Sequence, residues 1–473
     1  MDYQTVVGLE IHAELLTNSK IFCSCSTTFG REANTQVCPV CMGMPGSLPT
    51  LNKKAVELAV KAGLALNCTI SDNLSFDRKN YFYPDLPKAY QISQFNNPLC
   101  KDGYIKIDYN GKPKKIGIAD IHIEEDAGKL VHAENGQTLI DYNRCGVGLI
   151  EIVTKPDINF AEEAKLVFEE IKDILECLKI SDCKMQEGSL RCDVNVSVMP
   201  LGTQTLGERT EIKNLNSFGA VARAIKNESQ RQIEVIKSGQ KVIRQTRKWD
   251  DLTGKNTLLR NKENSDDYRF FPEPDLPTIK IGKSFIDNIK ESIIELPRDK
   301  KVRFMKDYLL SEFDAHLISR DLNVSNWFEK AVSYGADVKR ISSFIVTDIR
   351  RLMKEKKLEK IPFEPEKLVK LVSMINDGVI SLTASKQIIE IMFESTDAPE
   401  IIAKKNNLIQ VSDENELDLI AQVVLNENKE AVDDYKKGKE KAILYLTGQV
   451  MKKTRGSANP IVINKLLREK LSN

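Results

Sequence analysis

The sequence predicts an α+β fold over residues 1–293, followed by a region that is helical throughout. Two segments in the first region alternate strictly between apolar and polar residues, as strands with one buried face do. Other segments carry apolar residues at the spacing of amphipathic helices. Because strands and helices do not alternate regularly along the chain, a doubly wound parallel sheet is disfavoured.

The clearest strands are expected over residues 1–16 and 190–198. In each, every second residue is apolar, which predicts one face on a core and one face turned outward. The outward positions are Glu10, His12 and Glu14 in the first strand and Arg191, Asp193, Asn195 and Ser197 in the second.

Helical periodicity predicts three helices in the first region, over residues 51–65, 164–178 and 218–238. After Pro297 the strand signals fade and helices dominate. The expected helices cover 299–320, 326–334, 338–355, 364–376 and 381–393. Together with a helical segment from 407, this gives three predicted domains, 1–293, 294–406 and 407–473.

The bulk composition is that of an ordinary globular protein. Of 473 residues, 41% are apolar and 29% are charged, and the net charge is only +1. We find no signal peptide and no apolar run long enough to span a membrane, so we expect a cytoplasmic protein without a membrane partner. Ten cysteines in a chain of this length do not form a disulfide framework.

Four of those cysteines fall within 19 residues, as Cys23-x-Cys25 and Cys38-x-x-Cys41. Two close pairs can each form a tight turn that presents two thiolates, which suits tetrahedral Zn²⁺. With all four positions filled by sulfur, such a site is structural and leaves no place for a reacting water. The alternative is four buried or reactive cysteines placed by chance.

Motifs of the common enzyme classes are absent. The chain has no Walker A loop, no dinucleotide fingerprint, no G-x-S-x-G and no H-E-x-x-H. Only four histidines occur, at positions 12, 122, 132 and 316. The chemistry therefore has to come from residues outside these motifs.

Carboxylates concentrate on the predicted strands instead. An acid in an apolar strand is costly unless it is paired or bound to a cation, and several acids facing one cleft favour a divalent metal. Arg78, Lys79, Arg191 and Lys213 could then neutralise a phosphate. The alternative is a set of solvated strand faces with surface ion pairs. The acids are Glu10, Glu124, Glu125, Asp126, Glu151, Asp193 and Glu211.

Two loops share the element Pro-Asp-Leu-Pro, in residues 77–91 and 270–277. Both mix charged, aromatic and proline residues without a period. Stiff, decorated loops of this kind suit the wall of a site or a subunit interface, although a rigid connector would look the same.

Seven long segments occur in one order: VGLEIHAEL, NTQVCPVCMGMPGSLPTLN, FDRKNYFYPDLPKAYQISQ, HIEEDAGKL, EGSLRCDVNVSV, RTEIKNLNSF and YRFFPEPDLP. They resemble the B subunits of tRNA-dependent amidotransferases, the GatB family, over nearly the whole chain. The final DYKKGKEKAILYLTGQVMKKTRGSANP resembles the YqeY-like tail of that family. Two positions depart from the family pattern, Gly148 in place of proline and Asp120 in place of a basic residue.

The resemblance implies a glutamine-synthetase-like cradle with a zinc knuckle, then an all-helical domain and a YqeY-like tail. It implies an ATP- and Mg²⁺-dependent ligase that phosphorylates the side-chain carboxylate of Glu-tRNA(Gln) or Asp-tRNA(Asn). Ammonia from a glutaminase A subunit then attacks the acyl phosphate, and a small C subunit completes the complex. Zn²⁺ at the four cysteines would support recognition of the tRNA acceptor end.

Carried over by position, the resemblance assigns site residues. Metal ligands and catalytic residues would be Glu10, His12, Glu125 and Glu151, with Lys213 catalytic. Lys79, Glu124, Arg191, Asp193 and Glu211 would contact metal or phosphate. In the tail, Lys452, Lys453 and Arg455 would bind the tRNA backbone without reading bases. For this tail alone, a solvated helical face is the alternative.

Two other functions stay open on the sequence. A zinc-containing tRNA-binding module without catalysis would use no ATP. A ligase for a small carboxylate on the same fold would not need residues 407–473.

Overall fold

The structure is a computed structural model that describes residues 2–133, 135–203, 205–261, 265–410, 414–454 and 458–472. The chain divides into two compact units, residues 1–296 and 297–473. Buried apolar side chains form one cluster in the first unit and two in the second. The α+β prediction is confirmed, and the three-domain division stays a prediction.

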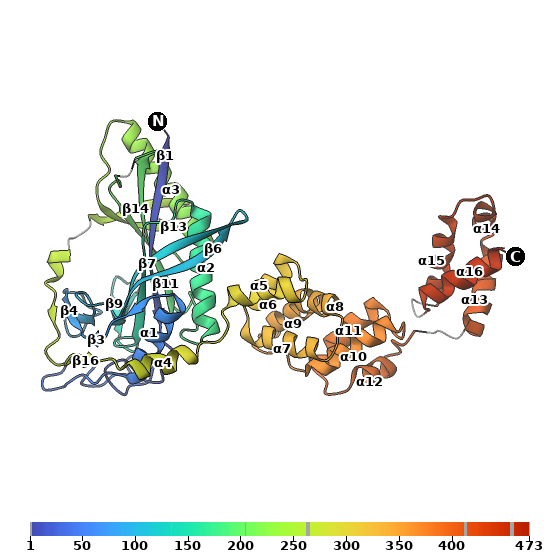
Figure 1. The fold of residues 1–473 in the computed structure, drawn as a ribbon, viewed down its shortest axis with the longest axis horizontal. Helices are drawn as coiled ribbons and strands as arrows, with labels where there is room; N and C mark the ends of the chain where they lie inside the picture. The colour runs from blue at the N-terminus through green and yellow to red at the C-terminus, as the bar shows by residue number, and fades with distance from the viewer. Residues whose placement is uncertain are drawn as a thin grey trace. The chain divides into compact units, whose positions relative to one another are not determined.

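A nine-stranded sheet forms the centre of the first unit (Figure 1). All neighbours in it are antiparallel except β12 and β13, which are parallel. The strands in spatial order are β14 (Lys255–Asn261), β13 (Gln245–Asp250), β12 (Thr210–Lys213), β11 (Leu190–Pro200), β1 (Tyr3–Glu14), β10 (Gly148–Thr154), β7 (Lys112–Glu125), β6 (Cys100–Tyr109) and β2 (Thr69–Ile70).

Strands β1 and β11 are the two that the alternating patterns predict. Their apolar positions, such as Leu9, Ile11, Val194 and Val196, are fully buried in the core of the first unit. Because side chains alternate between the faces of a strand, the polar positions of both strands lie on the opposite face of the sheet.

Three helices supply the rest of this core: α1 (Lys53–Ala65), α2 (Ala161–Cys177) and α3 (Phe218–Lys237). Asn52 caps α1 and Ser217 caps α3, each accepting a hydrogen bond from a backbone N–H of the first turn. All three match the sequence prediction to within three residues. They pack on the apolar face of the sheet, so the charged side chains lie on the opposite face.

The two Pro-Asp-Leu-Pro loops come together in a small sheet of β15 (Phe271–Pro272), β4 (Asp77–Asn80) and β5 (Tyr90–Ser93). Arg78 on β4 pairs with Glu273 through two hydrogen bonds, Nε to Oε2 at 2.7 Å and Nη2 to Oε1 at 2.8 Å. Segments about 190 residues apart thus form one wall, and β5 lies against β7 of the large sheet.

The remaining elements of the first unit are short. They are β3 (Asn73–Leu74) paired with β16 (Ile279–Lys280), β8 (Lys129–His132) paired with β9 (Thr138–Asp141), the 3₁₀ turn Ser265–Tyr268 and α4 (Lys283–Glu291).

The second unit is helical, as predicted. Its helices are α5 (Pro297–Asp307), α6 (Glu312–Ser319), α7 (Leu322–Ser333), α8 (Val338–Phe344), α9 (Arg350–Glu355), α10 (Pro365–Asn376), α11 (Leu382–Met392), α12 (Pro399–Lys405), α13 (Glu414–Glu427), α14 (Lys429–Lys436), α15 (Ala442–Lys453) and α16 (Pro460–Ser472).

Two predicted helices of this unit are interrupted. The stretch 299–320 breaks between α5 and α6, where Leu309 takes a positive φ of 53° and Ser311 caps the next helix. The stretch 338–355 contains a π-helical turn over Ile345–Ile349. Within the described part of the chain, no helix is both long and apolar enough to cross a membrane.

Candidate active site

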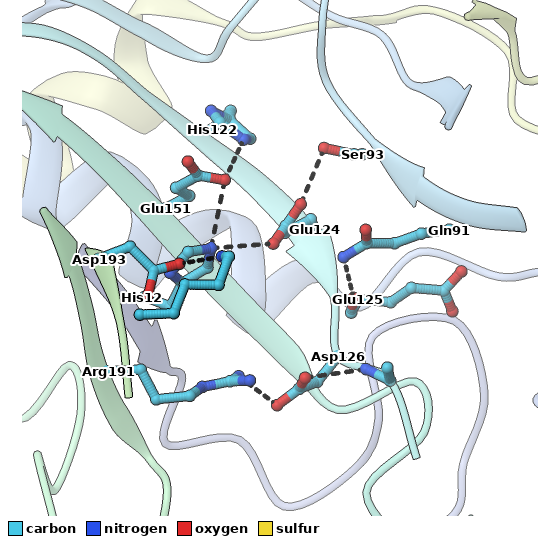
Figure 2. A network of polar contacts seen from close by, with 12 residues as sticks. His12, Gln91, Ser93, His122, Glu124, Glu125, Asp126, Glu151, Arg191 and Asp193 are labelled. Atoms are coloured by element: carbon cyan, nitrogen blue, oxygen red, sulfur yellow. Dashed lines mark hydrogen bonds and ion pairs between the residues drawn. The ribbon is translucent and has the colours of Figure 1, made fainter. Parts of the chain in front are cut away.

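The register of the large sheet brings charged side chains from five strands together. On β1, His12 lies opposite Glu151 of β10 on one side and Arg191 of β11 on the other. Glu10 lies opposite Asp193 of β11. Residues directly opposite one another in a sheet share a face, so these side chains converge on one face. Figure 2 shows His12, Glu151, Arg191 and Asp193 of this group close together.

The first cluster consists of His12, Glu124 and Glu151, whose ligand atoms lie within 4.8 Å of one another. His12 Nε2 is 3.4 Å from Glu151 Oε2 and 3.7 Å from Glu124 Oε1. On the other side of Glu151, His122 Nε2 lies 3.2 Å from Glu151 Oε2 (Figure 2). His122 Nδ1 lies 2.9 Å from Asp120 Oδ1.

Charges in the first cluster stabilise one another. Burial by itself would lower the pKa of His12 and of His122, but the carboxylate of Glu151 reverses this effect and raises both. The pKa of His122 reaches about 10. Burial would raise the pKa of Glu151, and the two imidazoles instead hold it well below its ordinary value. A metal ion bound here would have to displace a proton from His12.

The second cluster consists of Glu10, Asp193 and Glu211, again with ligand atoms within 4.8 Å of one another. Lys213 pairs with the Asp193 carboxylate and lies 3.3 Å from Glu211 Oε1. Burial would lower the pKa of Lys213, but Asp193 and Glu211 raise it. Asn195 Nδ2 donates to Glu10 Oε1 at 2.7 Å, so the three acids are held by fixed donors.

A cavity of about 310 Å³ opens beside the second cluster. Glu10, Asn195 and Arg244 are among its lining residues. Asn195 Oδ1 and Arg244 Nε are buried and have no hydrogen-bond partner in the described residues.

The two clusters fit hard divalent cations. Carboxylate oxygens are the protein ligands that Mg²⁺ prefers, and its remaining positions are commonly filled by water and phosphate. Each cluster offers three ligand atoms from three neighbouring strands. Lys213 lies beside the second cluster, and an ammonium group of this kind can pair with a phosphate.

Known proteins resemble the chain along its whole length. A family profile described as the GatB/GatE catalytic domain matches residues 5–287, and one described as the GatB domain matches residues 326–471. The B subunit of the aspartyl/glutamyl-tRNA(Asn/Gln) amidotransferase of Caldicellulosiruptor bescii is 52% identical over 479 residues, which cover 100% of this chain and 99% of that protein.

Two further relatives carry the same name. The protein of Caldanaerobacter subterraneus subsp. tengcongensis is 52% identical over 474 residues and covers 100% of each chain. The protein of Clostridium botulinum is 47% identical over 472 residues, which cover 99% of each chain.

The chain belongs to the GatB family. It is therefore one of the B subunits of the glutamine-dependent tRNA amidotransferases, enzymes of the ligase type.

In this GatB chain, six of the residues assigned from the resemblance lie in the two clusters. They are Glu10, His12, Glu124, Glu151, Asp193 and Glu211. Lys213 lies between two of them. Their individual roles stay predictions.

Glu125 does not join either cluster. It follows Glu124 directly on β7, so its side chain turns to the other face of the strand (Figure 2). There its carboxylate pairs with Lys88 and accepts a hydrogen bond from the Ile92 N–H at 2.8 Å. A role as metal ligand at the clusters does not follow from this placement.

The predicted phosphate-binding cations lie in different surroundings. Arg191 pairs with Asp126, next to the first cluster (Figure 2). Lys79 lies 5.2 Å from the ring centre of Tyr268 and 5.8 Å from that of Tyr81. Arg78, bound to Glu273, serves the wall of β4 and β15.

The four cysteines of the predicted zinc site come together, with sulfur atoms within 4.8 Å of one another. Gly43 and Gly46, just after Cys41, take positive φ values of 66° and 82° that close the turn. A hydrogen bond from the Cys23 thiol, with a further contribution from Lys20, lowers the pKa of Cys41 to about 4 against the effect of burial. Four convergent sulfurs are the donor set of structural zinc, so the residues fit the metal.

In the tail, Lys452 and Lys453 end α15, and Lys453 Nζ lies 2.7 Å from Glu427 Oε1. Arg455, also predicted to bind tRNA, lies outside the described residues.

Sequence reasoning did not assign His122, Lys88 or Lys20. A signal existed for His122, because it stands two residues before Glu124 and so shares its strand face. Lys20 and Lys88 reach their partners only through contacts between distant segments, which no local pattern shows.

Proposed function

We propose that this protein uses ATP and Mg²⁺ to phosphorylate the side-chain carboxylate of misacylated Glu-tRNA(Gln) or Asp-tRNA(Asn), and then directs its amidation. The single observation that carries the proposal is the pair of acid clusters on one face of the sheet, with Lys213 beside the second. A non-catalytic RNA-binding module has no need for two such clusters, because burying so many acids is costly.

Activation is necessary because a free carboxylate is a poor electrophile and has no good leaving group. Magnesium bound at the clusters would neutralise phosphate charge and align the terminal phosphate of ATP with the attacking carboxylate. Lys213, which pairs with Asp193 and Glu211, would stabilise negative charge on the transferred phosphoryl group. His122 fixes the orientation of Glu151, and Asn195 fixes that of Glu10.

The cavity beside the second cluster suits a nucleotide. Its lining combines apolar Val6, Leu9 and Leu206 with Arg209 and Arg244. Pockets for such ligands are mainly apolar with a few placed polar groups. We therefore assign the ATP to this cavity, with its phosphates toward Glu10 and Lys213.

Ammonia would come from a glutaminase A subunit, with a small C subunit completing the complex. The relatives are named as subunits of an amidotransferase, which supports a division of labour between chains. We further propose that the zinc-bound loop of Cys23–Cys41 supports the acceptor end of the tRNA and that Lys452 and Lys453 contact its phosphates. The name of the relatives includes both amino acids, so the choice between Glu-tRNA and Asp-tRNA stays open.

The test is phosphate release from ATP by the complex reconstituted with A and C subunits. Misacylated Glu-tRNA(Gln) should stimulate release, whereas uncharged tRNA and free glutamate should not. Tight binding of charged tRNA without release would favour the RNA-binding module. Stimulation by free glutamate, undiminished without residues 407–473, would favour a ligase for small carboxylates.

A further inference from the structure

Lys20 is a fully buried lysine next to the four-cysteine cluster. Its Nζ lies 3.6 Å from Cys41 Sγ and 3.3 Å from the carbonyl oxygen of Tyr142. Within the described residues, no carboxylate lies within ion-pair distance of it. Lysines usually extend their ammonium group to water, so this position demands an explanation.

The backbone on both sides of Lys20 is fixed. Its N–H donates to the Cys25 carbonyl at 2.9 Å, and the N–H of Ile21 donates to the Gly146 carbonyl at 2.9 Å. The side chain therefore enters the space between the cysteine loop and the segment before β10, away from solvent. An ammonium group buried there costs several kcal/mol unless a negative charge compensates it.

The only source of that charge at hydrogen-bond distance, among the described side chains, is the sulfur of Cys41. Four thiolates around one Zn²⁺ carry a net double negative charge, which disfavours the complex in a poorly solvated site. An ammonium group that donates to one of these sulfurs offsets half of that charge and orients the ligand.

We propose that Lys20 is the built-in counter-ion of the zinc site and raises its affinity for the metal. The proposal rests on the zinc site assigned above. The competing explanation is that Lys20 only fills space. Metal binding separates the two, because a side chain that only fills space can be replaced by one of equal length without effect on zinc.

The experiment compares wild type, Lys20→Met, Lys20→Gln and Lys300→Met in the full complex. Methionine keeps the length of the side chain without charge, and glutamine keeps one N–H donor without charge. Lys300 is the matched control, since it is also buried but donates to Ser325 Oγ at 3.1 Å in the helical unit. Zinc per chain is measured by elemental analysis, and zinc affinity by competition with a chromogenic chelator.

We expect Lys20→Met to weaken zinc binding by about 10- to 100-fold, the usual effect of losing a group that supports a metal ligand. Lys20→Gln should fall between it and wild type, and Lys300→Met should match wild type. In Co²⁺-substituted protein, the sulfur-to-metal absorption band should shift in Lys20→Met alone.

Wild-type zinc affinity in Lys20→Met would overturn the counter-ion proposal and leave the zinc site standing. Wild-type protein without zinc would overturn the zinc site itself. If both neutral variants failed to fold at every zinc concentration, the ammonium group would serve the fold and not the metal, which would also contradict the proposal.

Discussion

The two units of the molecule treat charge in opposite ways. In the sheet unit, acids and histidines from five strands are brought together on one face, and several are largely buried. In the helical unit, most charged pairs lie at the surface, as between Lys330 and Glu364. All three groups of metal-ligating side chains found in the described residues belong to the sheet unit.

This difference follows from geometry. Opposite positions on neighbouring strands share a face at short distance, so a sheet can gather ligands from distant parts of the chain. A helix spreads its polar residues around a solvated surface instead. Charge changes should therefore have large effects on the sheet face and small effects on the helices.

The largest effect is expected for Glu151→Gln, which removes a charge at the centre of the first cluster. Charge stabilisation during phosphoryl transfer should weaken, and tRNA-dependent phosphate release should fall by about 100- to 1,000-fold. Glu366→Gln in the exposed part of the helical unit is the control and should leave the rate unchanged. Equal rates for both variants would show that the first cluster is not catalytic.

The second largest effect is expected in the small sheet of β15, β4 and β5, where a charge change should lower the stability of the fold. Glu273→Gln removes the carboxylate that pairs with Arg78. The Glu273 side chain is fully buried. We expect a loss of about 3 kcal/mol in the unfolding free energy of the sheet unit. This is at the low end for broken buried pairs because Arg78 stays partly exposed and keeps its ion pair with Asp275 at 3.1 Å.

The chain offers a convenient readout for this change. It has two tryptophans, Trp249 in the sheet unit and Trp327 in the helical unit. Urea unfolding followed by fluorescence in a Trp327→Phe background reports on Trp249 alone. A change below about 1 kcal/mol, the range of exposed pairs, would contradict a buried role for the pair.

In metal-free protein, acidification should increase the contribution of His122 to the stability of the sheet unit. It should decrease the contribution of His316 to the stability of the helical unit. The pKa of His122 is raised to about 10, so its stabilising effect is complete below its ordinary value of 6.5 and is lost as the pH rises through 10. Burial, with help from Arg320, lowers the pKa of His316 to about 4, so its contribution is present above 6.5 and is lost as the pH falls toward 4.

The check is the difference in melting temperature between wild type and each of His122→Asn and His316→Asn, measured from pH 5 to pH 10 with chelator present. The difference for His122 should shrink at alkaline pH, and that for His316 should shrink or reverse at acidic pH. If the melting-temperature differences of the two variants changed with pH in the same way, the two histidines would not have opposite pKa shifts.

The smallest effect is expected for Glu364→Gln, which removes the surface partner of Lys330 at 3.0 Å. Both groups remain solvated, so the ion pair adds little to folding. Thermal unfolding of the helical unit should be indistinguishable from wild type, and a clear loss would show that this exposed ion pair contributes to folding.

Much of the sheet unit could be predicted from the sequence, because its strands carry strict alternation. That pattern identified β1 and β11 and the outward position of Glu10, His12 and Asp193. It could not show that β1 and β11 are neighbours, since pairing over almost 190 residues leaves no local trace.

The remaining differences between the sequence prediction and the structure arise where the local pattern is ambiguous. The run of three acids after Ile123 did not show which carboxylate faces the site. Strand parity decides it, because Ile121 and Ile123 are buried and Glu125 shares their face, whereas Glu124 does not. The break at Leu309 escaped prediction because helical residues continue on both sides of it.

The proposed function depends above all on the binding of divalent cations by the two clusters on the sheet face. Anomalous X-ray diffraction from crystals of the complex grown with Mn²⁺ and ADP tests it most directly. We expect manganese peaks at His12–Glu124–Glu151 and at Glu10–Asp193–Glu211, with ADP in the adjoining cavity. Manganese or nucleotide bound elsewhere, with both clusters still closed by their own ion pairs, would contradict it.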